Sequence, residues 1–315
     1  MSLRRTALTI IIIFAALLAA GAARAVTIGF AQVGYESDWR TAFTADMKAE
    51  AARRGINLLY ANADNDAQRQ RAQVLGFVDA HVDAIVIAPV VVTGWTETLQ
   101  KVRAAGIPVF LADRAVDSDP SLFVARIAAD FNLEGRLAGA WLAQATLGAC
   151  GIVELQGSVG SEPTIQRHKG FLAVISQFPN MRILHSVGGD FTNEGGRKAM
   201  ENIIRSTDGL KDVCAVWSHN DNMLLGASAA MHAVGLHPGR DQLMVSVDGV
   251  PDIFRAMLAG DSNMSVELKS DIGKYIFDVV QGYLGGRRDY PKWVLIPSAL
   301  HTPADAAAVL ASRGF

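Results

Sequence analysis

Nine short apolar runs, separated by stretches with helical spacing, constrain the fold of this chain. The apolar runs are residues 27–33, 57–61, 84–88, 107–111, 152–155, 181–187, 215–217, 243–247 and 264–266. The helical stretches are residues 38–54, 66–80, 96–105, 132–146, 164–177, 193–206 and 222–234. Such alternation is typical of parallel sheets with helices on both faces. We therefore expect an α/β protein in which the second half of the chain repeats the architecture of the first.

Polar side chains follow several of these runs, at the turn where each run ends. They are Asp113 and Arg114, His219 and Asn220, Asp248, and Glu267. In an open parallel α/β sheet, ligands bind outside the carboxyl ends of the strands. The sequence therefore predicts a binding site at one rim.

The residue types at this rim suit a neutral polyol such as a sugar. Carboxylates accept hydrogen bonds from hydroxyl groups, whereas arginine and asparagine side chains donate to them. The candidate acceptors are Asp113, Asp248 and Glu267, the candidate donors are Arg40, Arg114, Arg167 and Asn220, and the candidate ring platforms are Trp39 and Phe191. Each has a structural alternative, such as a local ion pair for Asp113 and Arg114, a helix cap for Asn220, and a core position for Phe191.

The first 25 residues have the order of a secretory signal peptide. Two arginines precede an apolar stretch at 7–20, and small residues surround a cleavage point after Ala25. The apolar stretch is short for a membrane span, which needs roughly 20 residues. We expect an exported protein, with an uncleaved membrane anchor as the alternative.

Charge and cysteine content narrow the possible partners. The formal net charge is −2 and no basic stripe is present, so nucleic acid is not an expected partner. Cys150 and Cys214 each precede an apolar run, and two residues that enter neighbouring parallel strands at one edge can lie within bridging distance. In an exported protein we expect a structural disulfide away from the ligand rim, with two buried thiols as the alternative.

Catalytic and cofactor motifs are absent from the sequence. It contains no G-x-S-x-G, H-E-x-x-H, P-loop or G-x-G-x-x-G pattern, so we expect neither an enzyme nor a cofactor. Residues 62–66 lack the glycine and glutamate of a calcium loop; we expect no metal there, and a helix cap at Asn65. A glycosidase would need a carboxylate pair. Asp113 and Asp248 are candidates, but we expect neighbouring arginines to keep both ionised.

Two domains are expected in the exported chain. The crossing between them is placed near residues 129–131, and the last elements, from Glu267 on, are expected to return to the first domain. The expected division is 26–131 with 267–297, and 132–266 with 298–315. Several short crossings between two lobes would act as a hinge.

Five segments of the chain resemble the periplasmic sugar-binding proteins of ABC transporters, in the ribose-binding class. They are residues 111–114, 153–157, 167–171, 219–221 and 247–249; residues 34–40, 87–95 and 248–253 resemble the galactofuranose-binding subclass more closely. The resemblance implies a type I periplasmic binding protein fold, with two Rossmann-like lobes joined by a multi-strand hinge. The chain departs from ribose binders at Ala88, where they have asparagine before proline, which disfavours ribose.

The resemblance also implies the roles of individual residues. Trp39 and Arg40 would line the wall of the first lobe beside Glu36 and Ser37. The ring hydroxyls would be held by Asp113 and Arg114 in the first lobe and by Arg167, Phe191, Asn220 and Asp248 in the second, with Glu267 at the hinge. We expect a monomeric periplasmic receptor that closes on a monosaccharide, galactofuranose being favoured, and docks on a membrane permease. The alternatives are another pentose or hexose, or partnership with a chemoreceptor.

Overall fold

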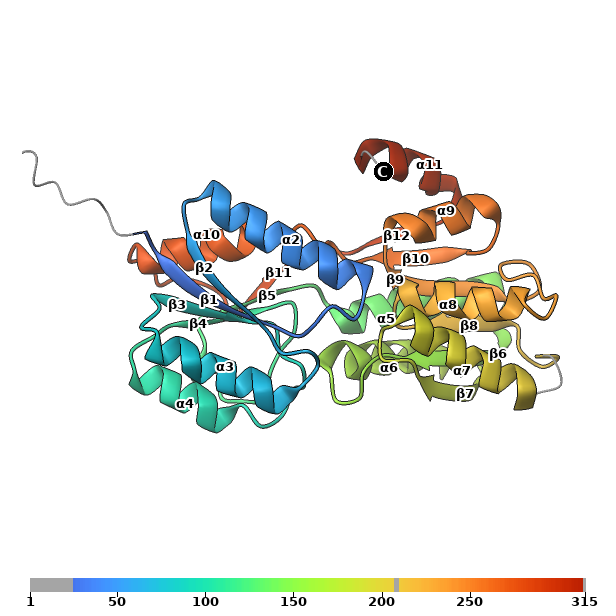
Figure 1. Ribbon diagram of the computed structural model, residues 1–315. Coiled ribbons are helices and arrows are strands. Elements are labelled where there is room, and N and C mark those ends of the chain that lie inside the picture. Colours follow the sequence, from blue (N-terminus) through green and yellow to red (C-terminus); the bar gives the residue numbers. More distant parts are fainter. Residues whose placement is uncertain (1–24, 207–209, 314–315) are drawn as a thin grey trace, which may run out of the picture.

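The structure, a computed structural model, describes residues 25–206 and 210–313 and contains two sheets flanked by helices (Figure 1). The expected signal peptide lies outside the described residues, apart from Ala25. The first lobe begins with β1 (Thr27–Gln32), α2 (Asp38–Arg53), β2 (Asn57–Asn62), α3 (Ala67–Asp79), β3 (Ala84–Ile87), α4 (Thr96–Ala104), β4 (Val109–Ala112), a 3₁₀ turn (Pro120–Leu122) and β5 (Arg126–Ala128). The α/β fold class expected from the sequence is confirmed.

The second lobe continues the alternation of strands and helices. Its elements are α5 (Phe131–Ala145), β6 (Ala149–Gln156), α6 (Glu162–Ile175), β7 (Asn180–Gly188), α7 (Asn193–Ser206), β8 (Ala215–Ser218), α8 (Asp221–His232), β9 (Leu243–Asp248), α9 (Pro251–Ala259) and β10 (Met264–Glu267). The chain then returns to the first lobe through α10 (Gly273–Leu284) and β11 (Trp293–Leu295), and ends in the second with β12 (Ala299–His301) and α11 (Pro303–Arg313).

The two sheets have the same strand order but differ in the direction of one edge strand. Their strand orders are β11-β5-β4-β3-β1-β2 and β12-β10-β9-β8-β6-β7, and every pairing is parallel except β10 with β12. Each sheet reverses its strand order beside its first strand, between β1 and β3 or between β6 and β8. Ligands bind at such switch points in open α/β sheets. The carboxyl ends of both sheets therefore provide the candidate site.

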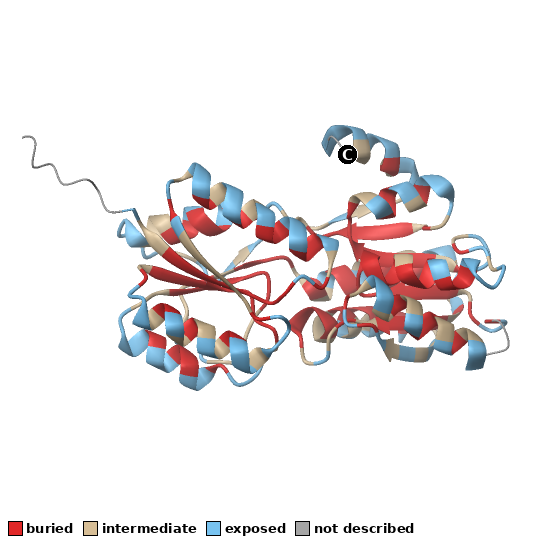
Figure 2. Cartoon of the chain, in the orientation of Figure 1, coloured by how far each residue is buried: buried red, intermediate tan, exposed pale blue. Residues whose placement is uncertain are grey.

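Three segments of the chain cross between the lobes. They are residues 129–130 after β5, residues 268–272 after β10, and residues 296–298 between β11 and β12. The buried residues concentrate on the sheets and on the helix faces that cover them (Figure 2). Within the described ranges, no helix has an apolar stretch long enough to cross a bilayer.

Most of the expected elements are present, and the exceptions are short or late in the chain. Six elements were not expected from the sequence: the three-residue strands β5, β11 and β12, and the helices α9, α10 and α11. The cap expected at Asn65 was wrong by one residue, because the carboxylate of Asp66 accepts from the backbone N–H groups of Gln68 and Arg69.

The expected disulfide is present between Cys150 and Cys214, whose Cα atoms are 5.5 Å apart. Cys150 lies at the start of β6 and Cys214 directly precedes β8, which pairs with β6 in parallel. The bridge therefore lies at the amino ends of these strands, away from the carboxyl ends that form the candidate site.

Two glycines allow α5 and α6 to cross at close range. A Cβ atom added at Gly135 would lie 2.1 Å from the carbonyl oxygen of Arg167, and one added at Gly170 would lie 2.0 Å from that of Asn132. Real Cβ atoms do not approach backbone oxygens so closely, so the crossing depends on both glycines. It also fixes where α6 presents Arg167.

We expect Gly170→Ala to lower the free energy of unfolding by about 1–3 kcal/mol, because the added methyl group must push α5 and α6 apart. The matched control is Gly76→Ala in α3, where a Cβ would meet nothing within 4 Å. That change should be neutral or stabilising by about 0.5–1 kcal/mol, because alanine is the better helix former. Denaturant unfolding of both variants measures the difference, and equal stabilities would contradict the packing argument.

Candidate functional site

A cavity between the lobes gathers ten of the eleven ligand residues expected from the sequence. The cavity volume is about 20 Å³, within about 270 Å³ of space between the atoms that includes space open to solvent. The ten are Glu36, Ser37, Trp39, Arg40, Asp113, Arg114, Arg167, Phe191, Asn220 and Asp248. Phe131, Pro163 and Leu268 complete the lining. Side chains far apart in the sequence, from both lobes, therefore converge on one site.

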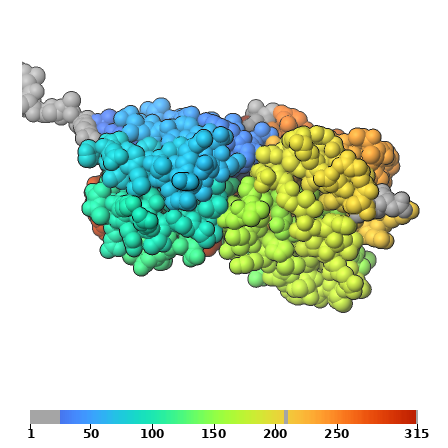
Figure 3. All heavy atoms as spheres, turned by 60° about the horizontal axis from the view of Figure 1, so that its bottom comes forward, coloured from blue at the N-terminus to red at the C-terminus, as the bar shows by residue number. Residues whose placement is uncertain are grey.

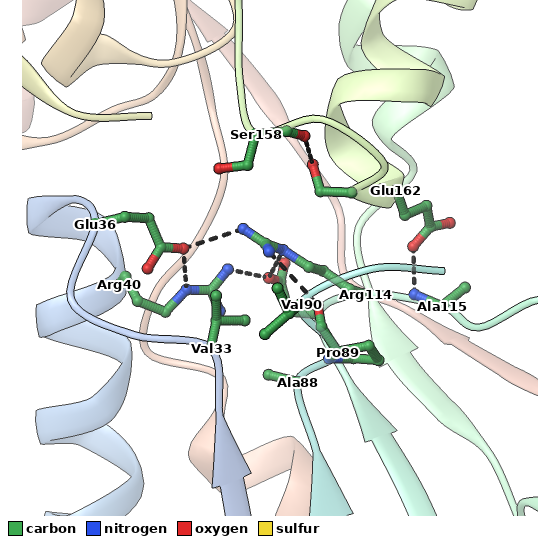
Figure 4. A network of polar contacts seen from close by, with 12 residues as sticks. Val33, Glu36, Arg40, Ala88, Pro89, Val90, Arg114, Ala115, Ser158 and Glu162 are labelled. Atoms are coloured by element: carbon green, nitrogen blue, oxygen red, sulfur yellow. Dashed lines mark hydrogen bonds and ion pairs between the residues drawn. The ribbon is translucent and has the colours of Figure 1, made fainter. Parts of the chain in front are cut away.

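The first lobe contributes a buried cluster of two arginines and two carboxylates. Glu36 Oε1 accepts from Arg40 Nε at 3.2 Å and from Arg114 Nη2 at 3.1 Å, as Figure 4 shows. Arg40 Nη2 also donates to Asp113 Oδ2 at 2.7 Å. All four side chains are at most 4% exposed. The opposite charges compensate one another, as buried charges require.

The pKa values in this cluster reflect burial opposed by the ion pairs. Burial would raise the pKa of Glu36, but Arg40 and Arg114 outweigh it and leave that pKa below its usual value. Burial, together with the like charge of Arg40, lowers the pKa of Arg114 to about 10. Glu36 is therefore ionised and Arg114 protonated at neutral pH.

The second lobe presents Arg167 from α6. Its Nε donates to Glu134 at 2.9 Å and its Nη1 to the carbonyl oxygen of His219 at 2.6 Å. The guanidinium group lies over the ring of Phe131, 5.2 Å from the ring centroid. The guanidinium is thus fixed in orientation by two hydrogen bonds and one aromatic ring.

Phe191 and Asn220 combine structural roles with positions at the cavity. The amide of Asn220 caps α8 by accepting from the N–H of Met223, and it donates to the carbonyl oxygen of Phe191 at 3.0 Å. The ring of Phe191 lies 5.5 Å from the guanidinium carbon of Arg114 in the other lobe. The helix cap considered for Asn220 is present, and so is its placement in the cavity lining.

Four buried polar atoms on the cavity residues lack a hydrogen-bond partner among the residues that the structure describes. They are Glu36 Oε2, Arg40 Nη1, Arg114 Nε and Arg167 Nη2. A buried polar group without a partner costs about 1–3 kcal/mol. One acceptor and three donors from two lobes can therefore pair with a ligand that carries several hydroxyl groups.

Asp113 and Asp248 both have a left-handed backbone where a strand ends. The φ angle is 65° at Asp113, directly after β4, and 124° at Asp248, the last residue of β9. Such conformations cost of the order of 1–3 kcal/mol and concentrate at functional sites. The equivalent strain in both lobes directs a carboxylate into the cavity from each.

Burial raises the pKa of Asp248 well above its usual value, although Arg167 opposes the shift. Arg167 Nη2 is 3.7 Å from Asp248 Oδ1, too long for a hydrogen bond. Desolvation therefore outweighs this distant partner in setting the pKa of Asp248, and arginine does not hold that pKa down as the sequence suggested.

Glu267, the eleventh expected residue, lies outside this cavity. Its carboxylate accepts from His301 Nε2 at 2.9 Å and pairs with Arg313 Nη2 at 2.5 Å. Together with Trp39, Asp248 and Arg313, it lines a neighbouring cavity. That cavity contains about 1140 Å³ of empty space, including space open to solvent. Glu267 is the last residue of β10 and directly precedes the second crossing, residues 268–272.

The two lobes are in contact on the face of the molecule that Figure 3 shows. Asp38 and Asn222 exchange two hydrogen bonds of 2.8 and 3.1 Å across the lobes. The carboxylate of Glu162 accepts from the N–H of Ala115, as Figure 4 shows. The same carboxylate pairs with Arg126.

Several residues of the site had no signal in the sequence. Pro163 and Leu268 line the cavity without a reactive group, and Glu134 lies behind it in the first turn of α5. Phe131 falls within the crossing that the sequence places near residues 129–131. Within the described ranges, no group of three or more acidic, histidine or cysteine residues is arranged to hold a metal ion.

Comparisons with known proteins agree with this geometry. A family model for the periplasmic binding protein domain matches residues 28–288. The galactofuranose-binding protein YtfQ of Escherichia coli (strain K12) is 43% identical over 301 residues, which cover 95% of this chain and 95% of that protein. Binding, rather than catalysis, is the function in that protein's name.

Two solved structures combine high similarity with a bound sugar. One is the periplasmic binding protein component of the arabinose ABC transporter from Shewanella sp. ANA-3, bound to α- and β-L-arabinofuranose. It is 47% identical, with a TM-score of 0.89 over 91% of this chain and 95% of that chain. The other, from Mycobacterium smegmatis in complex with β-D-fucofuranose, is 40% identical, with a TM-score of 0.89 over 92% and 95% of the two chains.

Proposed function

This chain belongs to the periplasmic binding protein family, and we propose that it is the sugar-binding component of an ABC importer that takes a furanose monosaccharide. The observation that carries the proposal is the cavity, in which one buried acceptor and three buried donors from both lobes await partners. The relatives named above bind or are named for galactofuranose, L-arabinofuranose and D-fucofuranose, which share a five-membered ring. Galactofuranose is the favoured ligand.

Hinge closure is the second part of the proposal. The sugar would bind in an open form and favour the closed one, because only closure brings Arg167 of the second lobe to the arginines of the first. The three short crossings provide the hinge, and they support a division into lobes near residues 130, 267 and 297. In this proposal the closed form, a monomer in the periplasm, docks on a membrane permease after its signal peptide has been cleaved after Ala25.

The test is calorimetry with D-galactose, L-arabinose, D-fucose and D-ribose, followed by carbon NMR of C1-labelled sugar on the protein. We expect binding of at least one of the first three, with the bound C1 signal of a furanose and weaker binding of ribose. The exposed variant Arg182→Ala should behave as the wild type. A pyranose signal would contradict the proposed ring form of the ligand. Failure to bind any pentose or hexose would contradict the proposed sugar-binding function.

A further inference from the structure

Glu134 is a fully buried acid that lies behind the cavity rather than in its lining. One carboxylate oxygen, Oε2, accepts from Arg167 Nε at 2.9 Å. The other, Oε1, accepts from the hydroxyl of Ser298 at 3.1 Å. Arg167 faces the proposed sugar, whereas Ser298 lies in the third crossing between the lobes. One side chain therefore joins the binding site to the hinge.

The contact between Glu134 and Arg167 controls the direction of Nη2, the Arg167 nitrogen that would pair with the sugar. Arg167 Nε is held by Glu134 and Nη1 by the carbonyl oxygen of His219, while Nη2 has no hydrogen-bond partner within the described part of the chain. A guanidinium group is planar, so fixing two nitrogens fixes the direction of the third. The aim of Nη2 into the cavity thus depends on Glu134.

The close helix crossing makes this arrangement specific. Glu134 directly precedes Gly135 on α5, and the carbonyl oxygen of Arg167 lies 2.1 Å from where a Cβ of Gly135 would be. Because the two backbones approach so closely, the side chains of Glu134 and Arg167 meet beside the crossing. The close crossing restricts the movement of α5 relative to α6. A displacement of the Glu134 side chain therefore changes the orientation of the Arg167 side chain.

We propose that Glu134 is a positioning residue that couples the orientation of Arg167, and hence sugar affinity, to the third crossing of the hinge. The proposal rests on the proposed function. When the lobes open, the backbone of residues 296–298 must change its conformation. The hydrogen bond from Ser298 to Glu134 connects this change to Glu134. When the sugar fixes Arg167, the carboxylate of Glu134 favours the conformation that residues 296–298 have in the closed form.

The position of Glu134 also gives the coupling a pH signature. Burial raises the pKa of Glu134 to about 7, against the opposing effects of Arg167 and of the Ser298 hydroxyl. The charges of Asp113 and Asp248 act on this carboxyl group as well, and both favour its neutral form. A sugar that locks Arg167 in place stabilises the ionised carboxylate and lowers its pKa. Coupling is reciprocal, so sugar affinity should rise as the pH increases toward 7 and level off above it.

The experiment is titration calorimetry with the best-binding sugar of the panel, at pH 6.5, in two buffers of different ionisation enthalpy. We expect the wild type to release a fraction of a proton on binding. Glu134→Gln preserves the shape and one acceptor; it should release fewer protons, bind about 10-fold more weakly at pH 8 and lose most of the slope between pH 6 and 8. Glu97→Gln, an exposed acid on α4, should match the wild type.

Two further variants separate Glu134 from its neighbours. Ser298→Ala removes a hydrogen bond that lowers the pKa of Glu134, so the pH at which affinity levels off should move upward. Asp248→Asn should weaken binding but retain a proton release that depends on Glu134. If Glu134→Gln does not fold, the wild-type proton count and the Ser298→Ala profile decide the question.

Three results would overturn the inference. Sugar binding by the wild type without proton release, or a Glu134→Gln protein with wild-type affinity and slope, would leave Glu134 a merely structural residue. An unshifted profile of Ser298→Ala would remove the link to the hinge. Failure of the wild type to bind any sugar is distinguishable from these results, because it removes the proposed function and the inference with it.

Discussion

Arg114→Ala is expected to weaken sugar binding by about 2–5 kcal/mol, which is on the order of 30-fold to several thousand-fold in Kd. The change deletes Nε, one of the buried donors without a partner, and removes the Nη2 bond to Glu36. Glu36 then depends on Arg40 alone for compensation of its charge. Calorimetry with the best-binding sugar measures the loss.

The thermal transition of this variant should move to a lower temperature. Without Arg114, the buried carboxylates of Glu36 and Asp113 share Arg40 as their ion-pair partner, which is destabilising, although the cost of burying Arg114 itself is relieved. Arg114→Lys is the informative partner, because an ammonium group keeps the charge but not the planar donor set. It should recover only part of the affinity. Wild-type binding by Arg114→Ala would exclude Arg114 from the site.

Removal of the disulfide is expected to have the largest effect on stability. The bridge joins Cys150 to Cys214 over a separation of 64 residues. A loop of that size corresponds to about 4 kcal/mol in the chain-entropy account, or on the order of 10 °C in Tm. Thermal unfolding of Cys150→Ser/Cys214→Ser, and of the wild type in reductant, should show this loss.

Sugar affinity should survive the same change. The bridge lies where β6 and β8 begin, whereas the cavity lies where the strands end. The double variant should therefore bind the sugar within a few-fold of the wild type at a temperature where both are folded. A large loss of affinity would mean that the bridge positions the site, and an unchanged Tm would contradict the stabilising role.

The strand exits were predictable because their signals are local. An apolar run followed by Asp113 and Arg114, or by Asp248, can be read from a few neighbouring residues, and both lobes repeat the pattern. The three-residue strands could not be read in this way, because so short a segment has no periodicity. Trp293–Leu295 becomes a strand only through its pairing with β5.

The supporting residues of the site were not predictable for a different reason. Glu134 has the same appearance in the sequence as a solvated glutamate on a helix, yet it is fully buried, because two glycines on different helices allow a close crossing. The pKa of Asp248 was misjudged because sequence adjacency says nothing about distance to Arg167. Both errors concern contacts that exist only after the second lobe has folded.

The return of the chain to its first sheet has a consequence for biosynthesis. The helix α10 and the edge strand β11 complete that sheet, but they are translated after nearly all of the other lobe. A nascent or truncated polypeptide that stops before Trp293 leaves β5 as an unprotected edge, open to pairing with another chain. Neither half can thus be expressed as a contiguous fragment with a finished sheet, and maturation of both must await the carboxyl-terminal residues.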